Sequence, residues 1–234
     1  MALPKLNSAK YTLSLPSSGE ELEFRPFLMS EQKNLMIAQE SEDDQQIQQA
    51  LANCINDCTF GKVDAWTLPA FDVEYIFLQI RSKAVGESVE IGLTCPDDEE
   101  TIVKKKIDLS KVQCTMHAGH TNEIQLTEDV KLIMRYPTLK DIAVAANPSE
   151  TEAMFDLVSN GISQIIDGET IHERVEIADE EMNEFIGSMT TDNLDQITNF
   201  FETMPKLTHE VSVKNPNTGK TGKVVLEGFQ SFFE

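Results

Sequence analysis

The sequence is poor in basic residues. Its 234 residues contain 19 Lys and Arg against 40 Asp and Glu, which gives a formal net charge of −21. The phosphate groups of nucleic acids and of anionic lipids are bound mainly by Lys and Arg. This shortage argues against nucleic-acid and membrane partners, and it favours protein partners with basic or neutral surfaces.

Long apolar runs and an abundance of cysteine are also missing. No run approaches the roughly 20 apolar residues that cross a bilayer, and the start of the chain lacks the apolar core of a signal peptide. Four cysteines are too few for a disulfide scaffold, so we expect free thiols in a reducing cytoplasm. The hydrophobic content of 40% is enough for a buried core.

The N-terminal part predicts a β-hairpin followed by helices. Residues 11–15 alternate between apolar and polar, and the run 22–28 follows after a polar turn, with Pro26 restricting it to a sheet edge. Ser30 and Ser41 are the expected N-caps of two helices. The second helix carries one apolar stripe, formed by Ile47, Ala50, Leu51, Cys54, Ile55 and Cys58.

The rest of the chain predicts further helices and hairpins. A helix over 73–84 stops at Gly86, and a hairpin follows at about 88–110. Another hairpin closes the chain at about 207–228. Between the two hairpins we expect a strand pair at 123–126 and 130–136, a helix from 149 to 166, and short helices at 182–189 and 194–201.

These patterns predict an α+β fold in which helices pack with short antiparallel hairpins. The hairpins at 88–110 and 207–228 resemble each other, because each has a Pro-containing polar turn and a Lys-rich arm. The resemblance suggests two related α+β regions, 1–115 and 116–234, with a single domain as the alternative.

One string resembles part of a nucleotide-binding motif. Gly-Lys-Thr at 219–221 ends like a phosphate-binding loop, which also needs a glycine five residues earlier, where this chain has Lys214. Such a loop lies between a strand and a helix, so that backbone N–H groups converge on the phosphates. Here the string falls in a predicted hairpin turn, and we interpret it as turn residues.

A second string could bind zinc. Cys114, His117 and His120 follow at intervals of three, and Cys95 lies upstream. Two Cys and two His can hold tetrahedral zinc. However, Cys95 and the proline after it are followed by two aspartates instead of a second cysteine, so we favour an ordinary loop and expect no cofactor.

The remaining cysteines and histidines do not indicate catalysis. Cys54 and Cys58 lie on the apolar stripe of their helix, where cysteine usually acts as a small buried hydrophobe. His172 and His209 lack a neighbouring nucleophile signature. We therefore expect no catalytic residues and no enzymatic activity.

Two aromatic segments are candidates for protein interaction. Phe24, Arg25 and Phe27 lie in the predicted edge strand, and aromatic residues and Arg commonly anchor interfaces. Burial of both phenylalanines in the core is the alternative. The C-terminal segment adds Phe229, Phe232 and Phe233, which could dock onto a neighbour or anchor the chain end.

Three segments resemble a known family. Residues 21–41, 56–91 and 132–139 resemble the baseplate hub proteins of T-even-like contractile-tailed phages. The most specific words are Phe-Arg-Pro-Phe at 24–27 and FDVEYIFLQIRSK at 71–83. The similarity extends over most of the chain.

The resemblance implies a structural component of the phage tail baseplate hub that is assembled in the host cytoplasm. It implies contacts with other hub and tail proteins, while the acidic composition and the missing catalytic signature predict no nucleic-acid, membrane or small-molecule partner. A transient assembly chaperone absent from the mature virion is the first alternative, and a zinc-binding enzyme or module is the second.

Overall fold

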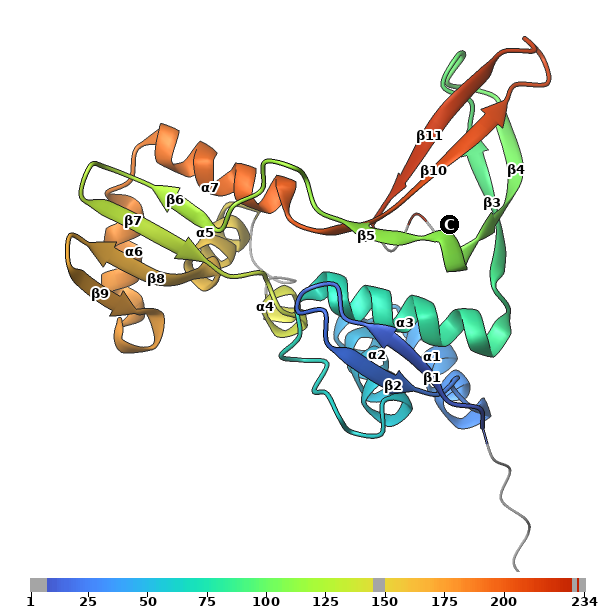
Figure 1. Cartoon of the computed structure of the whole chain (residues 1–234), viewed down its shortest axis with the longest axis horizontal. Coiled ribbons are helices and arrows are strands. Elements are labelled where there is room, and N and C mark those ends of the chain that lie inside the picture. The colour runs from blue at the N-terminus through green and yellow to red at the C-terminus, as the bar shows by residue number, and fades with distance from the viewer. Residues whose placement is uncertain (1–7, 145–149, 229–230, 232–234) are drawn as a thin grey trace, which may run out of the picture. The chain divides into compact units, whose positions relative to one another are not determined.

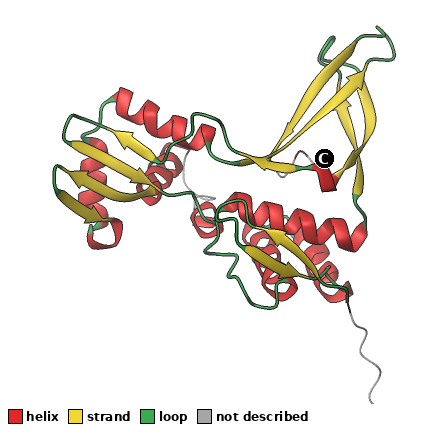
Figure 2. Cartoon of the chain, in the orientation of Figure 1, coloured by secondary structure: helices red, strands yellow, loops and turns green. Residues whose placement is uncertain are grey.

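Figure 1 shows the computed structural model of the chain. It describes residues 8–144, 150–228 and 231. These residues form helices and four small antiparallel sheets, so the predicted α+β fold is confirmed (Figure 2). The chain divides into two compact units: unit 1 is Met1–Thr115 with Pro205–Glu234, and unit 2 is Met116–Met204.

The first part of unit 1 joins a β-hairpin to three helices. The elements are β1 (Tyr11–Ser14), β2 (Glu21–Phe24), α1 (Met29–Glu40), α2 (Asp44–Cys58) and α3 (Ala70–Val85). The hairpin is tied to α3 because the carboxylate of Asp72 accepts hydrogen bonds from the N–H (3.0 Å) and the hydroxyl of Ser17. It is tied to α2 by the N–H of Arg25, which donates to the carbonyl of Cys58 at 2.9 Å.

The helix starts differ from the prediction. Ser30 lies inside α1, which begins after Leu28, and the carboxylate of Glu31 accepts a hydrogen bond from the Leu28 N–H at 2.6 Å. Ser41 ends α1, and Asp43 is the N-cap of α2, accepting from two amides of the first turn. The carboxylate of Asp43 reaches these amides, so it takes the capping role expected of Ser41.

The second part of unit 1 consists of two hairpins and a short strand. The elements are β3 (Ser88–Thr94), β4 (Ile102–Asp108), the 3-10 turn η1 (Leu109–Lys111), β5 (Gln113–Thr115), β10 (Lys206–Lys214) and β11 (Thr221–Glu227). β3 pairs with β4, while β11, β10 and β5 form a three-stranded sheet. The predicted grouping of the terminal hairpin with 116–234 is thus not what the chain adopts, because β10 pairs with β5 of unit 1.

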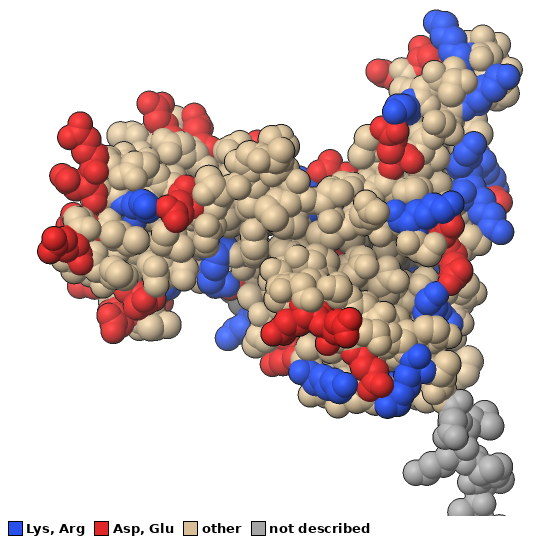
Figure 3. All heavy atoms as spheres, in the orientation of Figure 1, with Lys and Arg blue, Asp and Glu red and all other residues tan. Residues whose placement is uncertain are grey.

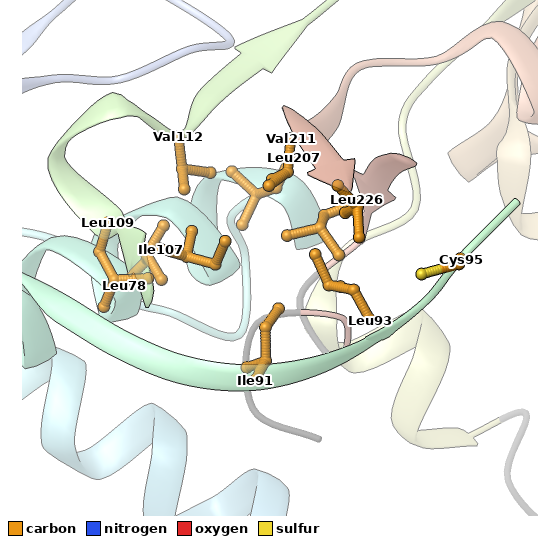
Figure 4. Packing of buried hydrophobic residues seen from close by; sticks show 11 residues of the cluster. Leu78, Ile91, Leu93, Cys95, Ile107, Leu109, Val112, Leu207, Val211 and Leu226 are labelled. Carbon is orange, nitrogen blue, oxygen red and sulfur yellow. The ribbon is translucent and has the colours of Figure 1, made fainter. Parts of the chain in front are cut away.

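These hairpins share one apolar core with α3. The cluster includes Leu78 from α3, strand residues from both hairpins and Val112 beside β5 (Figure 4). Its members are Leu78, Ile91, Leu93, Cys95, Ile107, Leu109, Val112, Leu207, Val211, Val213 and Leu226. Alternate residues of β3, Ile91 and Leu93, and of β10, Val211 and Val213, are buried in the cluster, as side chains that alternate between the two faces of a strand require.

Unit 2 packs helices with a four-stranded antiparallel sheet of order β6-β7-β8-β9. Its elements are β6 (Glu123–Gln125), β7 (Val130–Met134), α4 (Leu139–Val144), α5 (Glu150–Gly161), β8 (Ile162–Asp167), β9 (Thr170–Glu173), the 3-10 turn η2 (Arg174–Glu176), α6 (Asp179–Gly187) and α7 (Thr191–Thr203). Residues such as Leu132, Ile162, Met182 and Phe200 fill its core. None of the helices within the described residues combines the length and apolar character needed to span a membrane.

The helix predicted over 149–166 is too long. Position 149 lies outside the described residues, and α5 ends at Gly161. Ile162, Ile165 and Ile166 belong to β8, which pairs with β7 on one side and β9 on the other. β-branched residues suit a strand that is paired on both sides, and this pairing outweighs the helical spacing of the isoleucines.

Candidate protein-interaction surfaces

The segment 24–27 divides between the core and the surface. Phe24 is only 2% exposed, and its ring lies 5.7 Å from that of Tyr11. Its side chain is therefore part of the core and is not available to a partner in this structure, contrary to the prediction. Phe27 is half-buried and remains a candidate contact residue.

Arg25 also has a structural partner. Its guanidinium forms an ion pair with Glu31 at 3.0 Å, and the two side chains are 16% and 11% exposed. Burial raises the pKa of Glu31, but the hydrogen bonds from Arg25 and the Leu28 N–H outweigh burial and hold the pKa below its usual value. This pair joins the end of β2 to α1. The other candidates, Phe229, Phe232 and Phe233, lie outside the described residues.

Helix α1 presents apolar side chains to solvent. The exposed fractions are 76% for Met29, 54% for Met36 and 52% for Ile37. Its buried residues are Glu31 and Ala38. An amphipathic surface helix normally buries its large apolar residues, so α1 has the reverse arrangement. The outer face of α1 is therefore a candidate interaction surface.

This face was not predicted from the sequence. The available signal was the run Leu35-Met36-Ile37, because consecutive residues lie about 100° apart around a helix and this run spreads over about 200°. A short helix that packs on one side cannot bury all three side chains. Only Leu35 of the three is half-buried in the structure.

A groove lies between α1 and α2 beside this face. Its volume is about 270 Å³, and its lining includes Ile37, Ala50, Asn53 and Asp57. The surrounding residues 28–58 contain six acidic residues and one basic residue. The groove thus has apolar side chains in its lining and lies in a segment with an excess of acidic residues.

The zinc candidates are divided between the two units. Cys95 and Cys114 belong to unit 1, and His117 and His120 belong to unit 2. The ring of His120 is already engaged, since Nδ1 lies 3.0 Å from the Thr203 hydroxyl and Nε2 lies 3.0 Å from the Tyr136 hydroxyl. No group of three or more His, Cys, Asp and Glu side chains suited to a metal is found among the described residues.

The Gly-Lys-Thr string lies in the hairpin of β10 and β11, as predicted: Gly219 and Lys220 are in the turn, and Thr221 begins β11. Gly219 has φ +74°, and its N–H donates to the carbonyl of Asn215 at 2.9 Å. The side chain of Asn215 is 1% exposed, and its amide nitrogen donates to the carboxylates of Asp97 (2.9 Å) and Asp98 (2.7 Å) in the other hairpin. The hydroxyl of Thr218 also donates to Asp97. We call Asn215, Thr218, Asp97 and Asp98 the hairpin-tip cluster.

The buried cysteines of α2 provide a stability prediction. Cys54 is 2% exposed, and a hydrogen bond with Cys58, together with burial, raises the pKa of its thiol, which is therefore neutral. Replacing Cys54 with Ser puts a more polar group in this apolar site, so we expect the free energy of unfolding to fall by about 1–2 kcal/mol. Urea unfolding checks this. Asn53→Ser, at an exposed position of α2, is the control. An equal loss of unfolding free energy in both variants would contradict the burial of Cys54 in an apolar site.

A second prediction concerns Glu74 on α3. Burial raises the pKa of Glu74 from 4.5 to about 7. The folded state therefore favours the protonated carboxyl, and ionisation costs stability progressively as the pH rises from about 4.5 to about 7. Replacing Glu74 with Gln should stabilise the protein by roughly 1–3 kcal/mol at pH 8 and have little effect near pH 4.

Unfolding of the Glu74→Gln variant in urea at several pH values tests this prediction. Glu20→Gln is the matched control, because Glu20 is exposed in the turn between β1 and β2. A stabilisation that is the same at pH 4 and pH 8 would show that charge burial at Glu74 is not its cause.

Charge is distributed unevenly between the two units. Unit 2 contains 18 acidic and four basic residues, and so carries −14 of the net charge of −21. On the face shown in Figure 3, Lys and Arg side chains gather over the two hairpins of unit 1, whereas Asp and Glu predominate over unit 2. Unit 2 is therefore suited to contact with basic surfaces.

Comparison with known proteins adds one match. The sequence model of a family described as T4 bacteriophage base plate protein matches residues 8–234. No curated protein and no solved structure matched the chain. The family match thus covers both units, apart from the first seven residues of the chain.

Proposed function

The chain belongs to the T4 bacteriophage base plate protein family, and from this premise we propose that it is a non-enzymatic structural component of the baseplate hub. It acts through contacts with other hub and tail proteins, and it is assembled into the tail in the host cytoplasm. The observation that carries the proposal is the family match over residues 8–234. The exposed apolar face of α1 supports a role in protein contacts.

Quantitative mass spectrometry of purified mature phage particles, compared with infected-cell lysate, tests this proposal. A structural component is expected in the particle at a fixed low copy number relative to other tail proteins. Its presence in the lysate with absence from the particle would overturn the proposal.

A transient assembly chaperone is the second candidate. The charge of unit 2 favours it, because an excess of 14 negative charges could shield a basic partner before assembly. A chaperone would be found in lysate, bound to a hub protein, and would be missing from the particle. The same mass-spectrometry experiment therefore separates the two candidates.

A further inference from the structure

We propose that the groove between α1 and α2, together with the outer face of α1, binds an apolar helical segment flanked by Lys or Arg on another baseplate protein. This proposal rests on the function proposed above, because it specifies one of the contacts through which the chain would act. The surface consists of the groove and the exposed side chains of Met29, Met36 and Ile37 on α1. We call it the α1–α2 surface.

The density of exposed apolar side chains supports this assignment. Fifteen large apolar side chains are exposed among the described residues, and five of them fall within residues 28–47. Isolated exposed apolar residues are common on soluble proteins, whereas a group on one helix face indicates a binding surface. Met29 and Met36 are seven residues apart on α1 and therefore share one face of the helix. Two of the five are methionines, whose flexible side chains adapt to an apolar partner.

The shape of the groove indicates how a partner binds. A volume of about 270 Å³ is small for a whole helix, but it accommodates one or two apolar side chains that project from one. Recognition of an amphipathic helix commonly relies on a few apolar anchors in a groove between helices. The outer face of α1 would cover the apolar residues next to these anchors.

Charge defines the chemistry of the partner. Residues 28–58 carry six acidic residues against Lys33, and five of the six remain when Glu31 is set against its ion-pair partner Arg25. One of the carboxylates that line the groove, Asp57, is exposed. Lys or Arg beside the apolar anchors would complement this charge and speed association. Two copies of the same acidic surface would repel each other, so a second copy of this chain is disfavoured as the occupant.

Three synthetic helical peptides of equal length test the proposal against the full-length chain. The first has a leucine face flanked by lysines, the second has the same face flanked by glutamates, and the third has the composition of the first but no apolar face. We expect the first peptide alone to bind at micromolar concentration and to shift the NMR signals of α1 and α2. Equal binding of the first and third peptides, or shifts confined to unit 2, would overturn the proposal.

Ile37→Asp separates apolar anchoring from charge attraction. The substitution adds negative charge, so purely electrostatic binding of the lysine-flanked peptide would become tighter. We expect affinity to fall at least tenfold, because the anchor site beside Ile37 is lost. Val225→Asp is the matched control, since Val225 is 58% exposed on β11 of the same unit. Unchanged thermal stability of both variants confirms that they fold, and a wild-type affinity of Ile37→Asp contradicts the proposal.

The remaining outcomes are distinct. One outcome is that the wild-type chain self-associates, that Ile37→Asp is monomeric, and that the peptide does not compete with self-association. In that case the occupant of the surface is a second copy of the chain, and the proposal is wrong. Phage carrying Ile37→Asp should incorporate less of the chain into the particle. Normal incorporation would overturn the α1–α2 contact but leave the structural role intact, whereas absence of the wild-type chain from particles would overturn the structural role itself.

Discussion

Replacing Asn215 with Asp should separate the tips of the two hairpins of unit 1 at neutral pH. The Asn215 amide donates to Asp97 and Asp98 at 2.9 and 2.7 Å, so an aspartate there would place a third carboxylate against two others. Loss of the buried amide hydrogen bonds alone, as in Asn215→Ala, should cost about 1–3 kcal/mol. Asn215→Asp should cost more at pH 7, because like charges repel at this distance.

The pH dependence provides the sharper test. In the wild-type protein, hydrogen bonds from Thr218 and then Asn215 hold the pKa of Asp97 below its usual value of 3.8, and bonds from Thr101 and then Asn215 do the same for Asp98. Their contribution to stability is present above pH 3.8 and is lost as the pH falls through their lowered pKa values. In Asn215→Asp, the new carboxylate should have the opposite effect of pH on stability. The neighbouring carboxylates raise its pKa, and its protonation as the pH falls relieves the repulsion between the three groups.

Urea unfolding and hydrogen exchange of β10 and β11, measured between pH 3 and pH 8, check this expectation. The stability difference between Asn215→Asp and the wild type should shrink as the pH falls. Asn34→Asp is the control, because it is the same substitution at an exposed position of α1, outside the two hairpins. Equal losses for the two variants at pH 7 would show that the hairpin-tip cluster does not hold the hairpins together.

Truncating Phe200 to Ala should destabilise unit 2 by about 3–5 kcal/mol. Phe200 is 2% exposed on α7, and its ring lies 5.1 Å from that of His120 and 5.7 Å from that of Tyr136. The substitution removes these ring contacts and leaves a cavity in the core, which the surrounding helices and sheet cannot fill completely.

Hydrogen exchange of β7 and β8 reports the loss of stability in unit 2. Fluorescence of Trp66, the single tryptophan, reports the unfolding of unit 1. We expect a large loss of protection in the two strands. Phe155→Ala on α5, where the side chain is 40% exposed, is the control and should cost less than about 1 kcal/mol. If the two variants lose protection equally, Phe200 does not have the core role assigned to it.

Candidate residues were harder to predict than elements. Phe24 and Phe27 carry the same side chain and directly flank Arg25 and Pro26, yet Phe24 is buried and Phe27 is half-buried. The difference depends on the pairing of Tyr11 with Phe24 across the hairpin, which the sequence does not specify. The α1–α2 surface was missed because exposure of an apolar residue depends on the whole set of neighbours that fails to cover it.

The local elements and the net charge follow from the order of residues along the chain. The helix over 73–84, its stop at Gly86 and the hairpin at about 88–110 each depend on neighbouring residues and backbone preferences, so all three were predicted correctly. The excess of acidic residues and the family resemblance are likewise properties of the chain alone.

Which segments pair with each other depends on the complete fold. β8 is a strand because β7 and β9 pair with it on both sides, and the terminal hairpin joins unit 1 because β10 pairs with β5 about 90 residues earlier. These pairings exchange hydrogen bonds and bury apolar area between segments that are distant in sequence. Such gains depend on the complete fold, whereas periodicity and capping report only the preferences of adjacent residues.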